Sequence, residues 1–218
     1  MTAKYIVVEG TEGCFKTTNT QALADYLIAQ GFKVLVTKEP GTSHIPLTNQ
    51  LRAFMLDKQY DDVLTRPARE LISQAIRSIH LEKLIVPALT QYDYIIQDRG
   101  LLSGLAYGMA CGNTQREIDN LITYIMPRPF PIDWNIYDNI VFLKGDTEAG
   151  LKRALASKQE FETGDAIEAK GISFMREVEY NFYHILEQAP NSVVVDVTGK
   201  NREEVLSEIL KGIGVYGK

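Results

Sequence analysis

Cysteine and histidine are scarce in this chain. Its 218 residues include 2 cysteines and 3 histidines. Two cysteines are too few for the disulfide framework of a small secreted domain, so we expect a cytoplasmic protein. The histidines, His44, His80 and His184, lack the spacing of a zinc site, and we interpret them as structural or surface residues.

Long apolar runs and an excess of positive charge are missing as well. No run reaches the roughly 18 apolar residues of a membrane span, and the first residues do not have the layout of a signal peptide. The formal net charge of −5 argues against a nucleic-acid-binding surface. A hydrophobic content of 45% suffices for a buried core, and we expect a single domain over residues 1–218.

Short runs rich in valine and isoleucine alternate with longer stretches of helical periodicity. The runs predict five strands buried on both faces of a parallel sheet: 5–8, 34–37, 94–97, 140–143 and 193–197. The predicted helices span 18–30, 69–89 with an interruption at Pro87, 101–111, 147–157, 172–188 and 203–210. This alternation predicts a doubly wound α/β fold with helices on both faces of one five-stranded sheet.

A loop with two glycines joins the first predicted strand to the first predicted helix. It reads Gly-Thr-Glu-Gly-Cys-Phe-Lys-Thr-Thr over 10–18, in the strand–loop–helix setting of a P-loop. In such a loop backbone N–H groups hold phosphate oxygens, Lys16 reaches the β- and γ-phosphates of ATP, and the Thr17 hydroxyl binds Mg²⁺. The loop predicts a P-loop NTPase fold whose ATP site contains Gly10, Gly13, Cys14, Phe15, Lys16, Thr17 and Thr18.

Phe15 is the irregular residue of this loop, because glycine is expected before the lysine. If the position needs a positive φ, a bulky side chain there is strained by about 1–2 kcal/mol. The alternative for the whole segment is an ordinary strand-to-helix turn with a chance glycine and lysine. We interpret Cys14, at the start of a helix, as an oxidation-sensitive loop residue and not as a nucleophile.

The third predicted strand ends in Asp98 and Arg99, at the sheet edge where open α/β folds bind ligands. An aspartate there can hold Mg²⁺, and an arginine can clamp a phosphate with two hydrogen bonds. A strand-end salt bridge is the structural alternative for this pair alone. A glycine-containing loop, a lysine, a metal ligand and several arginines together predict phosphoryl transfer from ATP·Mg²⁺.

These residues resemble the thymidylate kinase family over nearly the whole chain. Besides the P-loop, the segments that resemble its motifs in order are 37–42, 51–52, 70–77, 98–107, 150–153, 165–168 and 193–196. The resemblance implies a deoxynucleoside-monophosphate kinase, dTMP kinase above all, with ATP as donor, Mg²⁺ as cofactor and a mobile lid over about 153–170. Many relatives form dimers, so a homodimer is also expected.

The resemblance also implies roles for single residues. Lys16, Arg99, Arg153 and Glu12 match catalytic positions, and Thr17 and Asp98 match metal ligands. Tyr107 matches an aromatic residue that discourages a 2′-hydroxyl. The residues expected to contact the acceptor nucleotide are Glu12, Glu39, Arg52, Ser73, Arg77, Arg99, Ser103, Tyr107 and Gly108, with Arg52, Arg77 and Arg99 around its phosphate.

The base-contacting positions depart from the family pattern. Ser73 stands where the family has a phenylalanine that stacks on thymine, and loss of such a ring forfeits roughly 1–3 kcal/mol. Gly108 replaces a glutamine, and Gly104 a common serine or threonine. A roomier pocket would favour a pyrimidine with a larger 5-substituent, such as 5-hydroxymethyl-dUMP.

Two further alternatives concern the reaction. Gly13 stands where some relatives carry an arginine, and the stretch 158–168 of the predicted lid has Lys158 as its one basic residue. Arg153, Lys158 and the more distant Arg176 are therefore the remaining candidate cations. This scarcity, together with Phe15, is also compatible with a catalytically weak nucleotide-binding regulatory protein. A nucleoside kinase is a closer alternative, but three acceptor-side arginines favour a substrate that already carries phosphate.

Overall fold

A five-stranded, all-parallel sheet forms the centre of the molecule. The computed structural model describes residues 2–128, 130, 136–157, 167 and 170–215. The strand order is β2-β3-β1-β4-β5, and each neighbouring pair is parallel. The five predicted strands are confirmed within about two residues at each end: β1 (Lys4–Gly10), β2 (Val34–Lys38), β3 (Tyr94–Asp98), β4 (Asn139–Lys144) and β5 (Ser192–Asp196).

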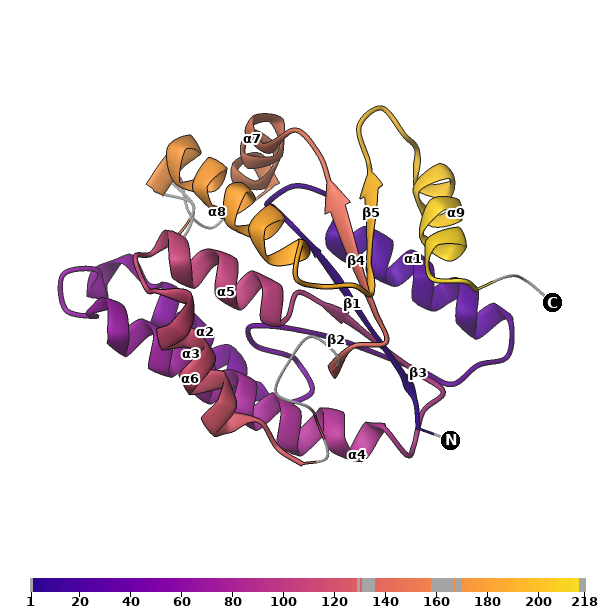
Figure 1. The fold of residues 1–218 in the computed structure, drawn as a ribbon, viewed down its shortest axis with the longest axis horizontal. Helices are drawn as coiled ribbons and strands as arrows, with labels where there is room; N and C mark the ends of the chain where they lie inside the picture. Colours follow the sequence, from indigo (N-terminus) through magenta and orange to yellow (C-terminus); the bar gives the residue numbers. More distant parts are fainter. Residues whose placement is uncertain (1, 129, 131–135, 158–166, 168–169, 216–218) are drawn as a thin grey trace.

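Helices cover both faces of this sheet, as predicted. Figure 1 shows α1 and α9 on one side and α3, α5 and α8 on the other. The helical elements are α1 (Lys16–Ala29), α2 (Pro46–Leu56), η1 (Lys58–Tyr60), α3 (Arg66–His80), η2 (Leu81–Ile85), α4 (Val86–Ala88), α5 (Leu101–Ala110), α6 (Gln115–Ile125), α7 (Thr147–Ser157), α8 (Gly171–Leu186) and α9 (Arg202–Gly212).

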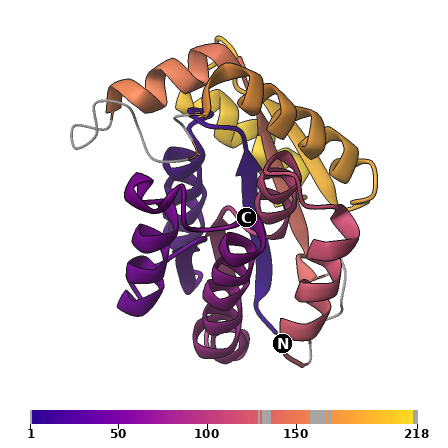
Figure 2. The ribbon, with the colours of Figure 1, turned by 90° about the vertical axis from the view of Figure 1, so that its left-hand side faces the viewer.

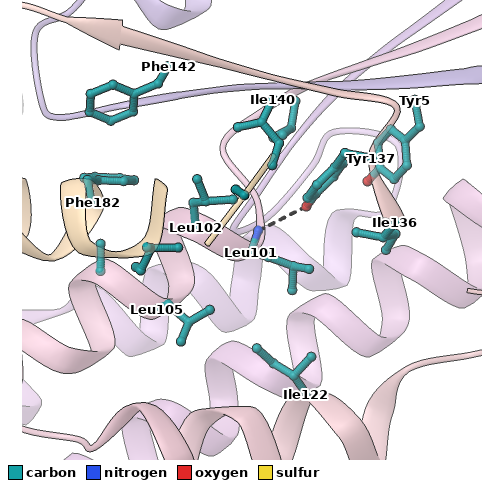
Figure 3. Close-up of a cluster of buried hydrophobic side chains, with 14 of the residues drawn as sticks. Tyr5, Leu101, Leu102, Leu105, Ile122, Ile136, Tyr137, Ile140, Phe142 and Phe182 are labelled. Carbon is teal, nitrogen blue, oxygen red and sulfur yellow. Dashed lines mark hydrogen bonds between the residues drawn. The ribbon is translucent and has the colours of Figure 1, made fainter. Parts of the chain in front are cut away.

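The core is divided by the sheet into two layers, because successive side chains of a strand point to opposite faces. Ile6 and Val8 of β1 pack in the layer under α1 and α9, whereas Tyr5 and Val7 pack in the layer under α5 and α8. Figure 3 shows part of the second layer, where the backbone N–H of Leu101 donates to the Tyr137 hydroxyl at 3.1 Å. This bond ties the start of α5 to the core.

The predicted interruption at Pro87 is wrong in its position. The irregularity lies earlier, in the π-helical turn η2, where the N–H of Val86 donates to the carbonyl of Leu81, five residues back. Proline lacks an N–H and its ring crowds the carbonyl four residues before it. The wide turn gives that carbonyl room, so the helical path continues through Pro87 to Ala88.

Helices α2 and α6 were not predicted from periodicity. The start of α6 carries a signal of its own: Thr114 and Glu117 form a capping box, with a hydrogen bond in each direction between one side chain and the other backbone. The α2 helix begins at Pro46, which is favoured in a first helical turn.

The carboxyl ends of the strands point toward the end of the molecule where α7 and α8 lie (Figure 2). No helix in the described part of the chain combines the length and the apolar character that a bilayer span requires. Most of the predicted lid, 158–166 and 168–169 with Lys158, lies outside the described residues. The lid therefore stays a prediction.

Candidate active site

A cavity of about 610 Å³ lies at the carboxyl edge of the sheet, between the loops that follow β1, β2 and β3 and helices α2, α3, α5 and α7. It brings together most of the residues that the sequence predicts as a site. Those that line it are Glu12, Gly13, Phe15, Lys16, Thr17, Thr18, Glu39, Arg52, Ser73, Arg77, Asp98, Arg99, Ser103, Tyr107, Gly108 and Arg153.

Two predicted site residues, Gly10 and Cys14, do not line this cavity. Gly10 has φ 145° and lies against the carbonyl of Leu143, where a Cβ would collide. The Cys14 side chain is fully buried in the core layer beneath the loop, 3.1 Å from the Thr11 hydroxyl. The expectation that Cys14 is open to oxidation is therefore wrong, because its side chain points into the core.

Phe15 has the positive φ that the sequence suggested, at φ 57° and ψ 30°. The strain expected for a bulky residue in this conformation is therefore present. Phe15 is 49% exposed, and the centre of its ring lies 4.9 Å from the guanidinium carbon of Arg153. Arg153 also donates from Nε and Nη2 to the carbonyl of Gly13, at 3.3 and 3.0 Å. Phe15 and Gly13 together hold this arginine of α7 against the P-loop.

Gly13 explains why this loop carries no arginine of its own. A Cβ at Gly13, which has φ 67°, would collide with the backbone of Gly150. The loop and the first turn of α7 approach each other through two glycines. Any side chain at position 13 would separate Arg153 from the loop that holds it.

Lys16 is buried, and its ammonium group donates to the carbonyl of Thr11. Burial lowers the pKa of Lys16, and the positive charge of Arg99 lowers it further, whereas the carboxylate of Glu12 acts in the opposite direction. An anionic phosphate in the loop would favour the charged form, because an opposite charge nearby stabilises it.

The two predicted metal ligands, Thr17 and Asp98, contact each other beside the P-loop. The Thr17 hydroxyl donates to Oδ2 of Asp98 at 2.6 Å, and Oδ1 of Asp98 is buried with no hydrogen-bond partner among the described residues. A hydroxyl and a free carboxylate oxygen suit Mg²⁺, which binds one or two protein oxygens together with phosphates and water. The described residues contain no cluster of three side chains that would hold a metal alone, and Mg²⁺ at a phosphate site does not need one.

Arg99 lies next to this pair and has a positive φ of 63°. Its guanidinium donates to Glu12 at 2.8 Å, to the Gly10 carbonyl at 3.0 Å and to the Ser103 hydroxyl at 3.1 Å. Burial lowers the pKa of Arg99, but the carboxylate of Glu12 and further negative groups outweigh it and raise the pKa above its ordinary range. Arg99 is therefore a permanent cation at the P-loop end of the cavity.

Glu9 positions this segment, a role that the sequence analysis did not assign. Its buried carboxylate accepts from the backbone N–H of Gly100 at 2.8 Å and of Ser103 at 3.1 Å, which satisfies the first turn of α5. Burial raises the pKa of Glu9, and its hydrogen bonds act in the opposite direction. A carboxylate at the end of β1 thus fixes the helix that follows β3.

Arg77 lies deeper, in a buried polar network. It donates to Oε2 of Glu39 at 3.0 Å, while His80 contacts Oε1 of Glu39 at 2.8 Å and the Thr37 hydroxyl at 2.8 Å. Burial raises the pKa of Glu39, but the charge of Arg77 and the hydrogen bond from His80 outweigh it, so the pKa lies below its ordinary value. His80 is a structural residue, as expected.

Arg52 differs from Arg77 and Arg99, the other two arginines predicted to surround the acceptor phosphate. It lines the cavity from α2, and within the described part of the chain its guanidinium has no hydrogen bond or ion pair. An unpaired cation at a cavity wall is available to an anion such as a phosphate.

Several lining residues were missed by the sequence analysis, and they gather around α3. The most consequential is Glu70, which is 7% exposed and occupies the same face of α3 as Ser73 and Arg77. The spacing i, i+3, i+7 could have indicated this shared face. The other missed residues of this end are Arg66, Arg69, Cys111 and Asn113.

The glycines of α5 do not leave empty space. A Cβ on Gly104 would collide with the guanidinium of Arg77, and one on Gly108 would lie 2.9 Å from Oε2 of Glu70 and 2.7 Å from Cδ1 of Ile118. The expectation of a roomier pocket at these glycines is therefore wrong. The volume is taken by side chains from α3 and α6, and two of them are charged.

Comparison with known proteins identifies the family. The family model described as thymidylate kinase matches residues 8–209. The chain is 31% identical to the thymidylate kinase of Finegoldia magna over 95% of this chain and 96% of that protein, and 34% identical to that of Prochlorococcus marinus over 86% and 85%. The crystal structure of thymidylate kinase from Ehrlichia chaffeensis, 23% identical, shares the fold with a TM-score of 0.72 over 97% of this chain and 98% of that chain. This chain therefore belongs to the thymidylate kinase family of nucleoside monophosphate kinases.

Proposed function

We propose that this chain is a dTMP kinase, which transfers the γ-phosphoryl group of ATP to dTMP and releases ADP and dTDP. One observation carries the proposal: a single cavity joins the P-loop with Lys16, the pair Thr17 and Asp98, and two further cations, Arg52 and Arg99. Two separate groups of phosphate ligands are needed when donor and acceptor both carry phosphate. This arrangement also disfavours a nucleoside kinase, whose acceptor has no phosphate to bind.

The donor phosphates would lie on the P-loop. The start of α1 directs backbone N–H groups and the helix dipole at them, and Lys16 neutralises the γ-phosphate. Mg²⁺ would be held by Thr17 and Asp98 together with phosphate oxygens, and it would neutralise charge on the β- and γ-phosphates.

The acceptor phosphate would lie between Arg99 and Arg52. An oxygen of that phosphate attacks the γ-phosphorus in line, a new P–O bond forms, and the bond from the γ-phosphorus to the β–γ bridging oxygen breaks. Arg153, held by Phe15 and the Gly13 carbonyl, would lie beside the transferred group and stabilise the negative charge spread over it. A cation already placed at the loop argues against a regulatory protein without catalysis.

The sugar of the acceptor would lie against Tyr107 and Glu12, whose side chains share a hydrogen bond of 3.2 Å. Burial raises the pKa of the Tyr107 hydroxyl, which keeps it protonated as a donor to the Glu12 carboxylate. Because the Tyr107 hydroxyl is bonded to Glu12, its ring would lie beside the 2′ position of the sugar. A 2′-hydroxyl would meet the ring, so we expect a deoxynucleotide to be preferred over its ribonucleotide.

The experiment that tests the proposal measures ADP release with each deoxynucleoside monophosphate, with thymidine and with UMP. Turnover of dTMP in the presence of Mg²⁺ supports it, and nucleotide binding by calorimetry without turnover of any acceptor would leave the regulatory alternative in its place. Turnover of thymidine but not of dTMP would establish the nucleoside kinase instead. The lid, the homodimer and the cytoplasmic location stay predictions.

A further inference from the structure

A buried polar group lies at one end of the cavity, on α3 and after α5. The side-chain amide of Gln74 donates to Oε1 of Glu70 at 2.6 Å, and Asn113 donates to Oε2 of Glu70 through a longer bond of 3.4 Å. Asn113 also donates to the carbonyl of Gly108 at 3.0 Å. The phosphate chemistry described above uses none of these three residues.

This polar group faces the end of the cavity that is remote from the phosphates. Arg99 and Gly100 lie at the start of α5, next to the P-loop, and Gly108 follows eight residues after Gly100. At the rise of an α-helix this is about 12 Å farther along the axis. The carboxylate of Glu70 lies against Gly108, so a nucleotide whose phosphate is at Arg99 directs its base toward Glu70.

The chemistry of Glu70 restricts what it can bind. A carboxylate accepts hydrogen bonds and donates none, and its two oxygens offer about four acceptor sites. One bond to Gln74 and one to Asn113 leave acceptor capacity on both oxygens. Gln74 in turn accepts from Arg77 at 2.8 Å through its own oxygen, so its amide is oriented to donate and Glu70 is held in place.

We propose that Glu70 is a specificity-determining residue, which extends the acceptor range of this site to deoxypyrimidine monophosphates that carry a hydrogen-bond donor at C4 or C5. This inference rests on the proposed function, since it concerns the acceptor of the same reaction. Along the edge formed by C4 and C5, thymine presents an acceptor oxygen and a methyl group, whereas cytosine presents an amino donor at C4. The N3–H donor of thymine is shared by the 5-hydroxymethyl base, so it does not distinguish those two acceptors. A 5-hydroxymethyl group presents a hydroxyl donor at C5.

The departures of this chain from its family agree with that role. Ser73, one helical turn after Glu70, replaces a stacking ring by a small polar side chain, and Gly108 gives the carboxylate the room that a glutamine would occupy. A buried carboxylate facing an acceptor oxygen costs binding, whereas one facing a donor gains a charge-assisted hydrogen bond.

The test compares kcat and KM of the wild type, E70Q and E82Q with dTMP, dCMP and 5-hydroxymethyl-dUMP. Glu82 lies in the same helical run as Glu70, is exposed and does not line the cavity, so E82Q is the matched control. We expect E70Q to lower kcat/KM for the donor-bearing nucleotide relative to dTMP by about tenfold or more, through KM, because a hydrogen bond to a charged group is lost. E82Q should leave that ratio as in the wild type.

Each outcome decides the proposal. The separate arms with dCMP and 5-hydroxymethyl-dUMP show whether the donor is at C4 or C5. Two results would overturn the inference and leave the proposed function standing. In the first, the wild type turns over dTMP but accepts neither dCMP nor 5-hydroxymethyl-dUMP. In the second, E70Q lowers kcat/KM equally for all three acceptors. No turnover with any acceptor ends the proposed function itself. If E70Q does not fold, N113A takes its place, with an expected loss in the same ratio of about threefold.

Discussion

The two ends of the cavity are built in different ways. At the end where we propose that the phosphates bind (the phosphate end), the groups follow strands directly. The P-loop comes after β1, Asp98 ends β3 and Arg99 follows it. The β3 strand pairs in register with β1, from Tyr94 opposite Lys4 to Asp98 opposite Val8. At the base end the polar side chains come from α3 and from the turn after α5, and they meet through helix packing. The first end is fixed by backbone pairing and the second by side chains.

This difference indicates where residues can be substituted without loss of phosphoryl transfer. A substitution at a strand end moves backbone N–H groups or the metal pair, and it affects every acceptor alike. A substitution on the inner face of α3 exchanges one side chain for another against an unchanged sheet. The four predictions that follow separate the two ends, from the largest expected effect to the smallest.

Glu39 joins the two ends, because it binds Arg77 of α3 from the loop after β2. We expect E39Q to lower the free energy of unfolding at pH 7 by about 3 kcal/mol or more, since the buried Arg77 loses its carboxylate partner. The pKa of Glu39 is lowered in the folded protein, so its stabilisation is present above its unfolded pKa of about 4.3 and is lost as the pH falls through the lower, folded value.

Urea denaturation of the wild type and E39Q at pH 7 and at pH 3.5 measures this effect. The difference between them should be largest at pH 7 and shrink at the lower pH. In the double variant E39Q/R77M the buried charge is removed as well, and part of the stability should return. A difference that does not depend on pH would mean that the ion pair is not its cause.

Lys16 tests the phosphate end. We expect K16M to lower kcat by about 100- to 1,000-fold, because charge on the transferred phosphoryl group loses a preorganised donor. The loss should be equal for all accepted nucleotides, measured as ADP release. The control K4M changes an exposed lysine at the opposite end of β1 and should leave the rate as it is. A loss of kcat that differs between acceptors would contradict the claim that Lys16 acts independently of the base.

Arg153 tests the contribution of α7. We expect R153A to lower kcat by about 100-fold with little change in the KM for dTMP, since an arginine at the transferred group acts mainly in the transition state. Arg176 of α8 is the matched control, because it is exposed and pairs with Glu148 at 3.7 Å, and R176A should retain the rate. Equal losses in both variants would contradict a specific role for Arg153.

Substitution of Phe15 by glycine should raise the stability of the protein and lower its rate. We expect F15G to raise the free energy of unfolding by about 1 kcal/mol, because glycine adopts φ 57° without strain. The same variant should lower kcat by about two- to fivefold, since Arg153 loses the ring beneath it. F15L keeps the strain and removes the ring, so it should show the lower rate alone. A higher kcat in F15G would show that the ring does not position Arg153.

Much of the fold could be predicted because its signals are local. A strand that is buried on both faces of a parallel sheet needs apolar residues at successive positions, and the run over 5–8 shows this pattern. The position of the wide π-helical turn before Pro87 could not be predicted from the sequence. Where the helix widens depends on how it packs and not on the proline alone. Cys14 was misjudged for a similar reason: the loop turns its side chain into the core.

The sequence by itself determined the chemistry at the phosphate end. The P-loop and the pair Asp98 and Arg99 each sit within a few residues of a strand end, so strand pairing brings them together in any fold of this class. Only the tertiary structure decided the base end and the position of Arg153. Glu70 and Gly108 are distant in sequence and meet because α3 and α5 both pack against α6. Arg153 reaches Gly13 because two glycines let α7 approach the loop. Contacts between helices depend on their packing, and no short sequence motif encodes them.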